Sequence, residues 1–154
     1  MPQTLDPRKV MTGHDGRLYA EVDGVSICML NVDTFQSQIN FSNIDFNAVG
    51  DRLTYAIPGN VSVSLTITEA VVTDEITIAP ILAALAAGKK IIFNFRGVLN
   101  REYDSQQQDI PYQNCVPDGT WDIQNLTPND VIKRALAFRV NSIPAPLKTL
   151  TGMF

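Results

Sequence analysis

The sequence predicts a mainly β domain, a barrel or a two-sheet sandwich, with one α-helix on its flank. Three observations lead to this fold class. Long runs alternate apolar and polar residues with a period of two, which is typical of strands that bury one face. Asp23-Gly24 lies between two such runs and indicates a tight hairpin. Only the segment 79–88 predicts a convincing helix, and at 131–141 a helix is a weak competitor to a strand, so strands must supply most of the core.

The length and the 45% hydrophobic content fit one domain. We expect an extended N-terminal arm at 1–16, a β domain at 17–141 and an extended C-terminal tail at 142–154. No apolar run approaches the roughly 18 residues that cross a bilayer, and no secretion signal is visible. Synthesis in a cytosol fits these features, and Cys28 and Cys115 are expected to be two reduced, inert thiols.

The elements follow in a simple order. Strands are expected at 17–22 and 25–31, then at 32–46 and 61–72, with a loop at 47–59 where glycine and proline break the alternation. The helix at 79–88 tolerates Pro80 in its first turn and stops at Gly88; Ile81, Leu82 and Leu85 form its apolar stripe. Further strands are expected at 91–100, 121–126 and 131–141, and a long polar loop at 100–120.

The two long central strands share an unusual property, since the polar side of each carries no charge. If they pair antiparallel, these side chains lie on one surface. The apolar side of the first strand carries Phe35, Ile39 and Phe41. The apolar residues of the second strand are expected to face the core of the subunit; they are Val61, Val63, Leu65 and Ile67. The uncharged polar set consists of Thr34, Gln36, Gln38, Asn40, Ser42, Ser62, Ser64, Thr66 and Thr68.

Charge is distributed unevenly along the chain. Between Leu18 and Gly88 the sequence holds eight acidic residues and a single basic one, Arg52. Binding to a phosphate backbone requires lysine and arginine, so this half does not predict a DNA-gripping surface. It permits nucleic acid to pass nearby without adhesion.

Catalytic and metal-binding patterns are absent from the sequence. The single histidine, His14, has no cysteine or carboxylate at ligand spacing, so no metal site, cofactor or catalytic residue is predicted. A sugar-binding β-sandwich is the alternative of a different class. Its stacking platform would have to come from Tyr103, Tyr112 and Trp121, for which core or interface packing is the competing interpretation.

A β domain with a long neutral hairpin and extended ends suggests a subunit whose strand edges are completed by other copies. The order of the segments resembles the tail tube proteins of contractile-tailed phages and phage-like particles, of the Gram-positive prophage type. The stretches that carry the resemblance are "MTGHDGRLYAEVDG", "DTFQSQINFSNIDFNAVGDRLTYAIPGNVSVSLTITEAVV" and "ITIAPILAALAAGKKIIFNF". The resemblance covers about residues 11–141.

The resemblance implies six copies per ring and rings stacked into a hollow tube, with a long hairpin of each subunit lining the channel. The nine uncharged polar residues are then the candidates for the channel wall. Implied partners are the protein itself, the sheath, the tape-measure protein, and baseplate and tail-terminator proteins; DNA passes through unless the particle is a bacteriocin. The implied location is a phage tail or tail-like particle assembled in the host cytoplasm. A secreted ring protein or a baseplate or hub component of a contractile injection system is the alternative.

The loop at 47–59 is the candidate for contact with an adjacent ring. Its candidate residues are Asn47, Asp51, Arg52 and Tyr55. Arg52 is expected to pair with an acidic residue of the neighbour. We also expect the extended termini to reach neighbouring subunits.

Overall fold

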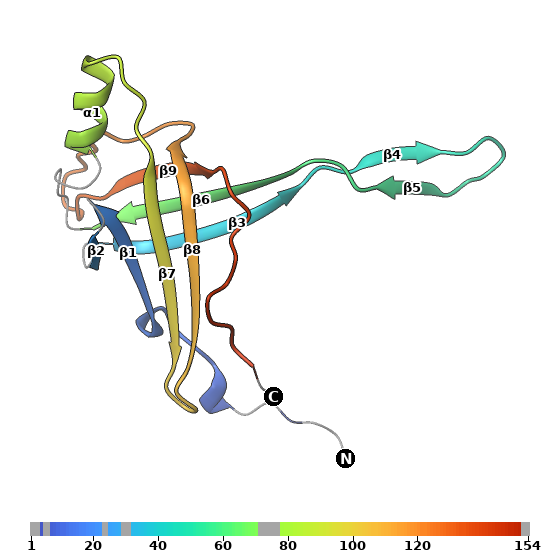
Figure 1. Cartoon of the computed structure of the whole chain (residues 1–154), viewed down its shortest axis with the longest axis horizontal. Helices are drawn as coiled ribbons and strands as arrows, with labels where there is room; N and C mark the ends of the chain where they lie inside the picture. Colours follow the sequence, from blue (N-terminus) through green and yellow to red (C-terminus); the bar gives the residue numbers. More distant parts are fainter. Residues whose placement is uncertain (1–3, 5–6, 23–24, 29–31, 71–77, 152–154) are drawn as a thin grey trace.

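The computed structural model describes residues 4, 7–22, 25–28, 32–70 and 78–151. Within these residues the chain is mainly antiparallel β with one α-helix, which confirms the predicted fold class (Figure 1). One seven-stranded sheet has the order β2-β1-β7-β8-β9-β6-β3, and β4 and β5 form a separate pair. The strands are β1 (Gly16–Val22), β2 (Val25–Cys28), β3 (Val32–Phe41), β4 (Ile44–Asn47), β5 (Thr54–Ile57), β6 (Val61–Glu69), β7 (Phe93–Arg101), β8 (Gln106–Pro117) and β9 (Arg134–Val140).

The large sheet bends sharply between β8 and β9. These strands pair only where Cys115–Pro117 meet Phe138–Val140. In Figure 1, β1, β7 and β8 run steeply across the direction of β9, β6 and β3. The bend lets the two halves of one sheet face each other across a single core.

Aromatic side chains fill the space between the two halves. Phe138 of β9 packs edge-on against Phe95 of β7 at 5.0 Å and against Trp121 at 4.9 Å between ring centroids. Phe35 of β3 packs against Tyr112 of β8 at 6.0 Å, directly above Gly97 of β7. A Cβ on Gly97 would lie 3.3 Å from the Phe35 ring, so this glycine allows the close approach of the two halves.

The predicted helix is present as α1 (Ile78–Ala86). It ends as expected at Gly88, whose left-handed φ of 68° a glycine adopts without strain. The amide of Lys89 donates to the carbonyl of Ala84 at 2.8 Å and closes the helix end. Ile78 is the buried residue of this helix, while Leu82 and Leu85 of the predicted stripe stay exposed and line a pocket.

Two predicted loops contain strands. Residues 54–57 of the predicted loop 47–59 form β5 and pair with β4, and most of the predicted loop 100–120 is β8. Pro111 is tolerated within β8 because β9 pairs only with Cys115–Pro117, which leaves one side of β8 without a neighbouring strand at that point. A proline costs a ladder hydrogen bond only where a strand lies on its N–H side.

One predicted strand is wrong, since residues 121–126 form none. The segment still runs beside β9. The indole Nε1 of Trp121 donates to the carbonyl of Ala137, and the carboxylate of Asp122 accepts from the amide of Ala135 at 3.2 Å. The amide of Ala135 therefore donates to the carboxylate of Asp122, where a regular ladder would use a backbone carbonyl, and no strand forms. The predicted strand at 25–31 ends at Cys28 in the described part; 29–31, Asp23-Gly24 and 71–72 lie outside the described residues.

The termini lie along the same half of the sheet. Two short 3-10 helices, Pro7–Lys9 and Gly13–Asp15, precede β1. The C-terminal segment runs beside β8, where Asp109 bridges to Lys148 and the side chain of Gln106 accepts from the amide of Thr151. That either end reaches a neighbouring subunit stays a prediction.

Candidate functional site

β3 and β6 form one long antiparallel hairpin whose uncharged polar residues lie directly opposite one another. Thr34 pairs with Thr68, Gln36 with Thr66, Gln38 with Ser64 and Asn40 with Ser62. Partners in an antiparallel pair project to the same side of the sheet. The pattern of two separate strands thus forms a single surface, here called the neutral face, and the predicted pairing of the two polar sides is confirmed.

The neutral face is open to solvent in the single chain. The side chains of its β3 half are exposed, and those of its β6 half are exposed or half-buried. Asn40 Nδ2 donates to Ser64 Oγ at 3.3 Å across the hairpin, and Ser42 follows the end of β3, where its amide donates to the carbonyl of Asn60. Such a surface can hydrogen-bond to water along its length but offers no fixed charge.

The opposite side of the hairpin is covered only over part of its length. Val63, Leu65 and Ile67 are buried in the core, as predicted. Farther along, Phe41 is 72% exposed, and Ile39 and Val61 are exposed as well. The prediction that Val61 faces the subunit's own core is therefore wrong, because the other half of the sheet does not reach that far.

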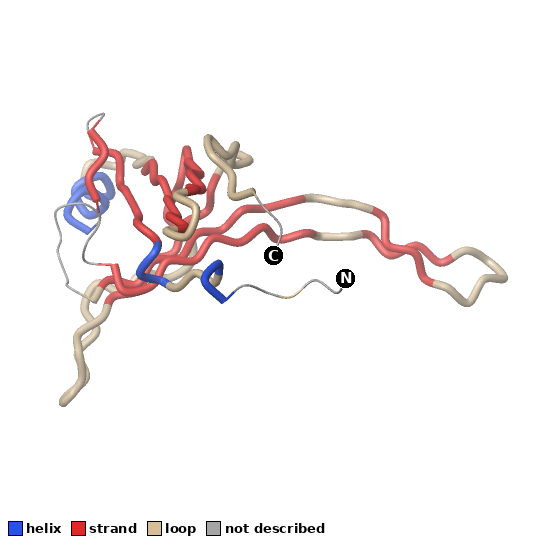
Figure 2. Tube along the Cα trace, turned by 90° about the horizontal axis from the view of Figure 1, so that it is seen from below, coloured by secondary structure: helices blue, strands red, loops and turns tan. Residues whose placement is uncertain are grey.

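β4 and β5 form an arm that projects from the body in both views (Figures 1 and 2). One side of the arm is apolar, with Ile44 opposite Ile57 and Phe46 opposite Tyr55. All four side chains are exposed. Large apolar patches on an isolated chain indicate contact with another molecule.

The tip of the arm is held by its own side chains. Asp51 accepts from the amide of Leu53 at 3.0 Å and from the hydroxyl of Tyr55 at 2.7 Å, and these bonds lower the pKa of its carboxyl group. Thr54 donates to Asn47 at 2.7 Å. Three of the four predicted contact residues of the loop are thus engaged within the tip. Arg52, the fourth, is exposed and forms no ion pair with the described part of the chain.

A third strand borders the neutral face, and its place beside β6 was not predicted from the sequence. β9 pairs with the other edge of β6, where Arg139 lies opposite Ser64 and Ala137 opposite Thr66. A basic side chain therefore lies at the edge of the neutral face. No local pattern shows that residues 64 and 139 are neighbours. The alternation in β9 indicates a strand but not which strand it pairs with.

The three aromatic residues of the alternative sugar site do not come together. Tyr112 is buried against Phe35, and Trp121 packs on Phe93 and Phe138. Tyr103 is exposed beside the guanidinium of Arg8, 4.6 Å from the ring centroid. A stacking platform requires aromatic faces that share one open surface, and these residues do not supply it.

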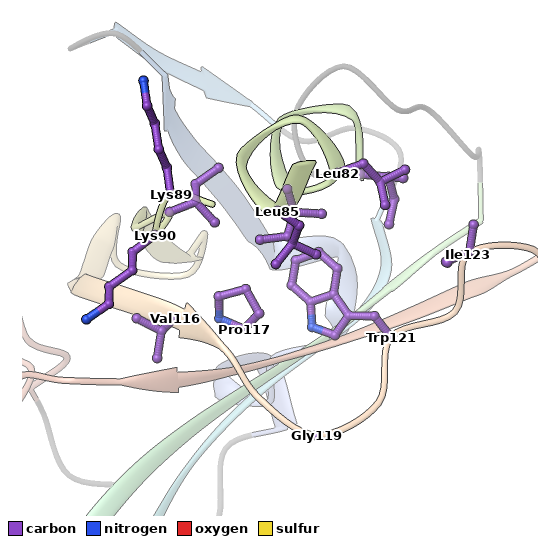
Figure 3. Close-up of a pocket in the computed structure, with 12 residues that line it drawn as sticks. Leu82, Leu85, Lys89, Lys90, Val116, Pro117, Gly119, Trp121 and Ile123 are labelled. Carbon is purple, nitrogen blue, oxygen red and sulfur yellow. The ribbon is translucent and has the colours of Figure 1, made fainter. Parts of the chain in front are cut away.

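A pocket of about 520 Å³ lies beside α1, at the end of the molecule away from the arm (Figures 1 and 3). Its wall is apolar, formed by Leu82 and Leu85 of the helix together with Trp121 and Ile123. Lys89 and Lys90 follow the helix and border the pocket.

Among the described residues, no group of His, Cys, Asp and Glu side chains could hold a metal ion, and His14 lies exposed in a short 3-10 helix. In the same part of the chain, no helix combines the length and apolar character of a membrane span. Cys28 and Cys115 are both free thiols, and Cys115 is buried.

No protein-family model matches the sequence, and neither does any curated protein. Solved structures match over nearly the whole chain. A chain in the structure of the anti-feeding prophage baseplate is 13% identical with a TM-score of 0.64, covering 90% of this chain and 96% of its own. A chain in the tube-terminating cap of the same prophage is 12% identical with a TM-score of 0.64, covering 96% and 97%.

Two further systems match at similar levels. A chain in the sheath-tube complex of the extracellular contractile injection system PVC is 12% identical, with a TM-score of 0.62 and coverage of 91% of this chain and 93% of its own. A chain in the virion of a native gene transfer agent is 13% identical, with a TM-score of 0.61 and coverage of 89% and 98%. The fold is thus that of components of contractile injection systems and phage tail-like particles. The similarity covers the tube, cap and baseplate assemblies of such particles.

Proposed function

We propose that the protein is the structural subunit of the inner tail tube of a contractile phage tail or tail-like particle. Identical copies form six-membered rings, and the rings stack into a hollow tube with the neutral face toward the channel. The tube conducts DNA, or punctures a membrane in a particle without DNA. This role is non-enzymatic and requires no cofactor.

The observation that carries the proposal is the two-sided character of the β3–β6 hairpin. One side is uncharged and hydrophilic over its whole length, while the other becomes exposed and apolar beyond the core. Exposing such an apolar side to water is unfavourable for an isolated chain, whereas an assembly of copies buries it. The edge of β3 also has no partner strand on its outer side within the described sheet, so a neighbouring copy can complete it.

The arm supports stacking as well as ring formation. Its apolar side, built from Ile44, Phe46, Tyr55 and Ile57, projects beyond the body, where an adjacent ring would lie. Since the other three candidates hold the tip, Arg52 is the residue left to pair with an acidic group of that neighbour. Partners at other surfaces are the sheath, the tape-measure protein, and the baseplate and terminator proteins.

A secreted ring protein or a baseplate component remains the second candidate function, because a baseplate structure is among those that match. Both candidates are self-assembling or assembly-bound parts. They differ in the length of polymer that the protein forms alone.

Negative-stain microscopy of the purified protein tests the proposal. We expect rings that stack into tubes on concentration; a compact monomer at all concentrations would overturn the assignment. Ile57→Lys, on the apolar side of the arm, should prevent stacking. Ala56→Lys, one residue away on the other side of the arm and opposite Asp45, is the matched control and should still form tubes.

Arg52 is tested separately by charge reversal. Arg52→Glu should shorten or abolish tubes without changing the stability of the isolated chain, because the arm tip does not contact the core. Tubes of full length with Arg52→Glu would remove the proposed ion pair between rings while leaving the tube assignment intact.

A further inference from the structure

The neutral face is bordered by two cations that its sequence pattern does not contain. Arg139 lies on β9 directly opposite Ser64, so it projects to the same side as the polar residues of β6. Lys133 precedes β9 at the far end of the face, beside Asp33, which comes directly before Thr34 in β3. Both belong to the second half of the sequence, outside the span that has almost no basic residues.

Each cation has a carboxylate partner from another part of the sheet. Arg139 lies 3.7 Å from Asp118, which follows β8 and is held there by a bond from its amide to the carbonyl of Ala137. Lys133 lies 3.0 Å from Asp33, which occupies the register shift in β3 between Val32 and Thr34. The irregularity in β3 thus coincides with the residue that pairs with Lys133.

These pairs contribute little to folding. All four side chains are well exposed to solvent, where an ion pair adds little to the stability of the fold. The pairs do change the electrostatic potential of the face, because each carboxylate lies within a few ångströms of a positive charge and cancels it. Attraction of a phosphate backbone depends on the number of cations that remain uncompensated.

We propose that Asp33 and Asp118 are charge-cancelling residues that prevent the neutral face from binding nucleic acid. The inference rests on the proposed function, in which this face lines a channel. Without the two carboxylates, every copy would expose two cations on the channel wall, and phosphate contacts would add along the tube. With them, the polar face lets a phosphate polymer slide past.

The experiment uses the unassembled chain, because each pair is contained within one copy. Asp33→Asn/Asp118→Asn removes two negative charges with little change in side-chain shape. Glu21→Gln/Glu102→Gln is the control with the same change in net charge, since both carboxylates are exposed on the β1–β7 half of the sheet or its turn, away from the face. Binding of a fluorescein-labelled double-stranded oligonucleotide of arbitrary sequence is followed by anisotropy.

We expect the Asp33/Asp118 variant to bind the oligonucleotide at least about tenfold more tightly than the control at low salt. The gained affinity should fall steeply as salt rises from about 50 to about 200 mM. Adding Lys133→Gln/Arg139→Gln should remove it. Equal binding by the two double variants, or a gain that survives loss of Lys133 and Arg139, would overturn the proposal.

The outcome is independent of tube formation. If the wild-type protein forms no tubes, the tube assignment fails while the comparison of binding remains valid. If tubes form, pelleting them with the same oligonucleotide gives a second measurement, in which the Asp33/Asp118 tubes retain it and the control tubes do not.

Discussion

Glu69 and Arg134 form a buried ion pair at the end of the core, with 2.8 Å between Oε2 and Nη2. The residues lie directly opposite each other on β6 and β9 and are 0% and 2% exposed. Arg134 Nε also donates to the same oxygen at 3.2 Å. Two strands that supply the neutral face on one side are therefore locked in register on the other side by a charge pair that water does not reach.

Loss of one partner should destabilise the fold strongly, because it removes the opposite charge 2.8 Å away in a site that is almost fully buried. Glu69→Gln is expected to lower the free energy of unfolding by about 3–5 kcal/mol. Glu69→Leu/Arg134→Met removes both charges and should recover much of this loss. Urea denaturation of the single and double variants measures the coupling. Strictly additive effects would show that the pair does not act as a unit.

The buried thiol of Cys115 predicts a pH dependence of stability. Burial raises its pKa to about 12, from an ordinary value of 9.0. Above pH 9 the unfolded chain releases this proton while the folded chain keeps it, so the free energy of unfolding falls as pH rises toward 12. The stability advantage of the wild type over Cys115→Ala should shrink by about 1 kcal/mol between about pH 8 and pH 10.

Urea denaturation at both pH values checks this, and the variant serves as the control for all other titrating groups. A constant difference between the two proteins would contradict the shifted pKa. In the folded wild type, Cys115 should also resist alkylation at a pH where a solvent-exposed thiol reacts.

The neutral face could be predicted because its information is local. The alternation in β3 and β6 fixes which side chains share a side, and both strands are long enough to show the period. β5 could not be recognised, since Thr54–Ile57 is too short to show a period between Gly50 and Pro58. β8 was missed because its Gln-rich composition and two prolines imitate a loop.

The pairings between strands that are distant in the sequence could not be predicted. Arg139 joins the neutral face only because β9 lies beside β6, and the partners Asp118 and Asp33 come from two other parts of the chain. For the same reason, the Glu69–Arg134 pair could not be predicted from the sequence. Glu69 and Arg134 are 65 residues apart in the sequence, so no local pattern indicates that they form an ion pair.

The hydroxyl pair of Ser37 and Tyr112 predicts a second measurable coupling. Their oxygens lie 2.7 Å apart where β3 packs onto β8, and Tyr112 is buried. Ser37→Ala should cost about 1–3 kcal/mol, because it leaves the Tyr112 hydroxyl without this partner inside the protein. Adding Tyr112→Phe should then cost less than it does in the wild type. Tyr55→Phe is the matched control, since its hydroxyl bonds Asp51 at the arm tip, and should leave the unfolding of the body nearly unchanged.

The junction of the arm depends on Gly59. A Cβ at this position would lie 2.1 Å from the carbonyl oxygen of Ser42, closer than two atoms approach without a bond. Gly59→Ala must therefore shift the backbone where the arm leaves the hairpin. Gly50→Ala is the matched control. An alanine at this φ of 84° is strained, but its Cβ meets nothing within 4 Å.

Spin labels at residues 49 and 123, both exposed, report the position of the arm relative to the body in a Cys28→Ser background. We expect Gly59→Ala to shift or broaden the distance distribution and Gly50→Ala to leave it nearly unchanged. Because the junction lies outside the core, the free energy of unfolding should change by less than about 1 kcal/mol in either variant. Tube formation should fail with Gly59→Ala, since the apolar side of the arm no longer meets its neighbour. Wild-type distances together with wild-type tubes in that variant would show that the junction tolerates a side chain and that glycine does not set the path of the arm.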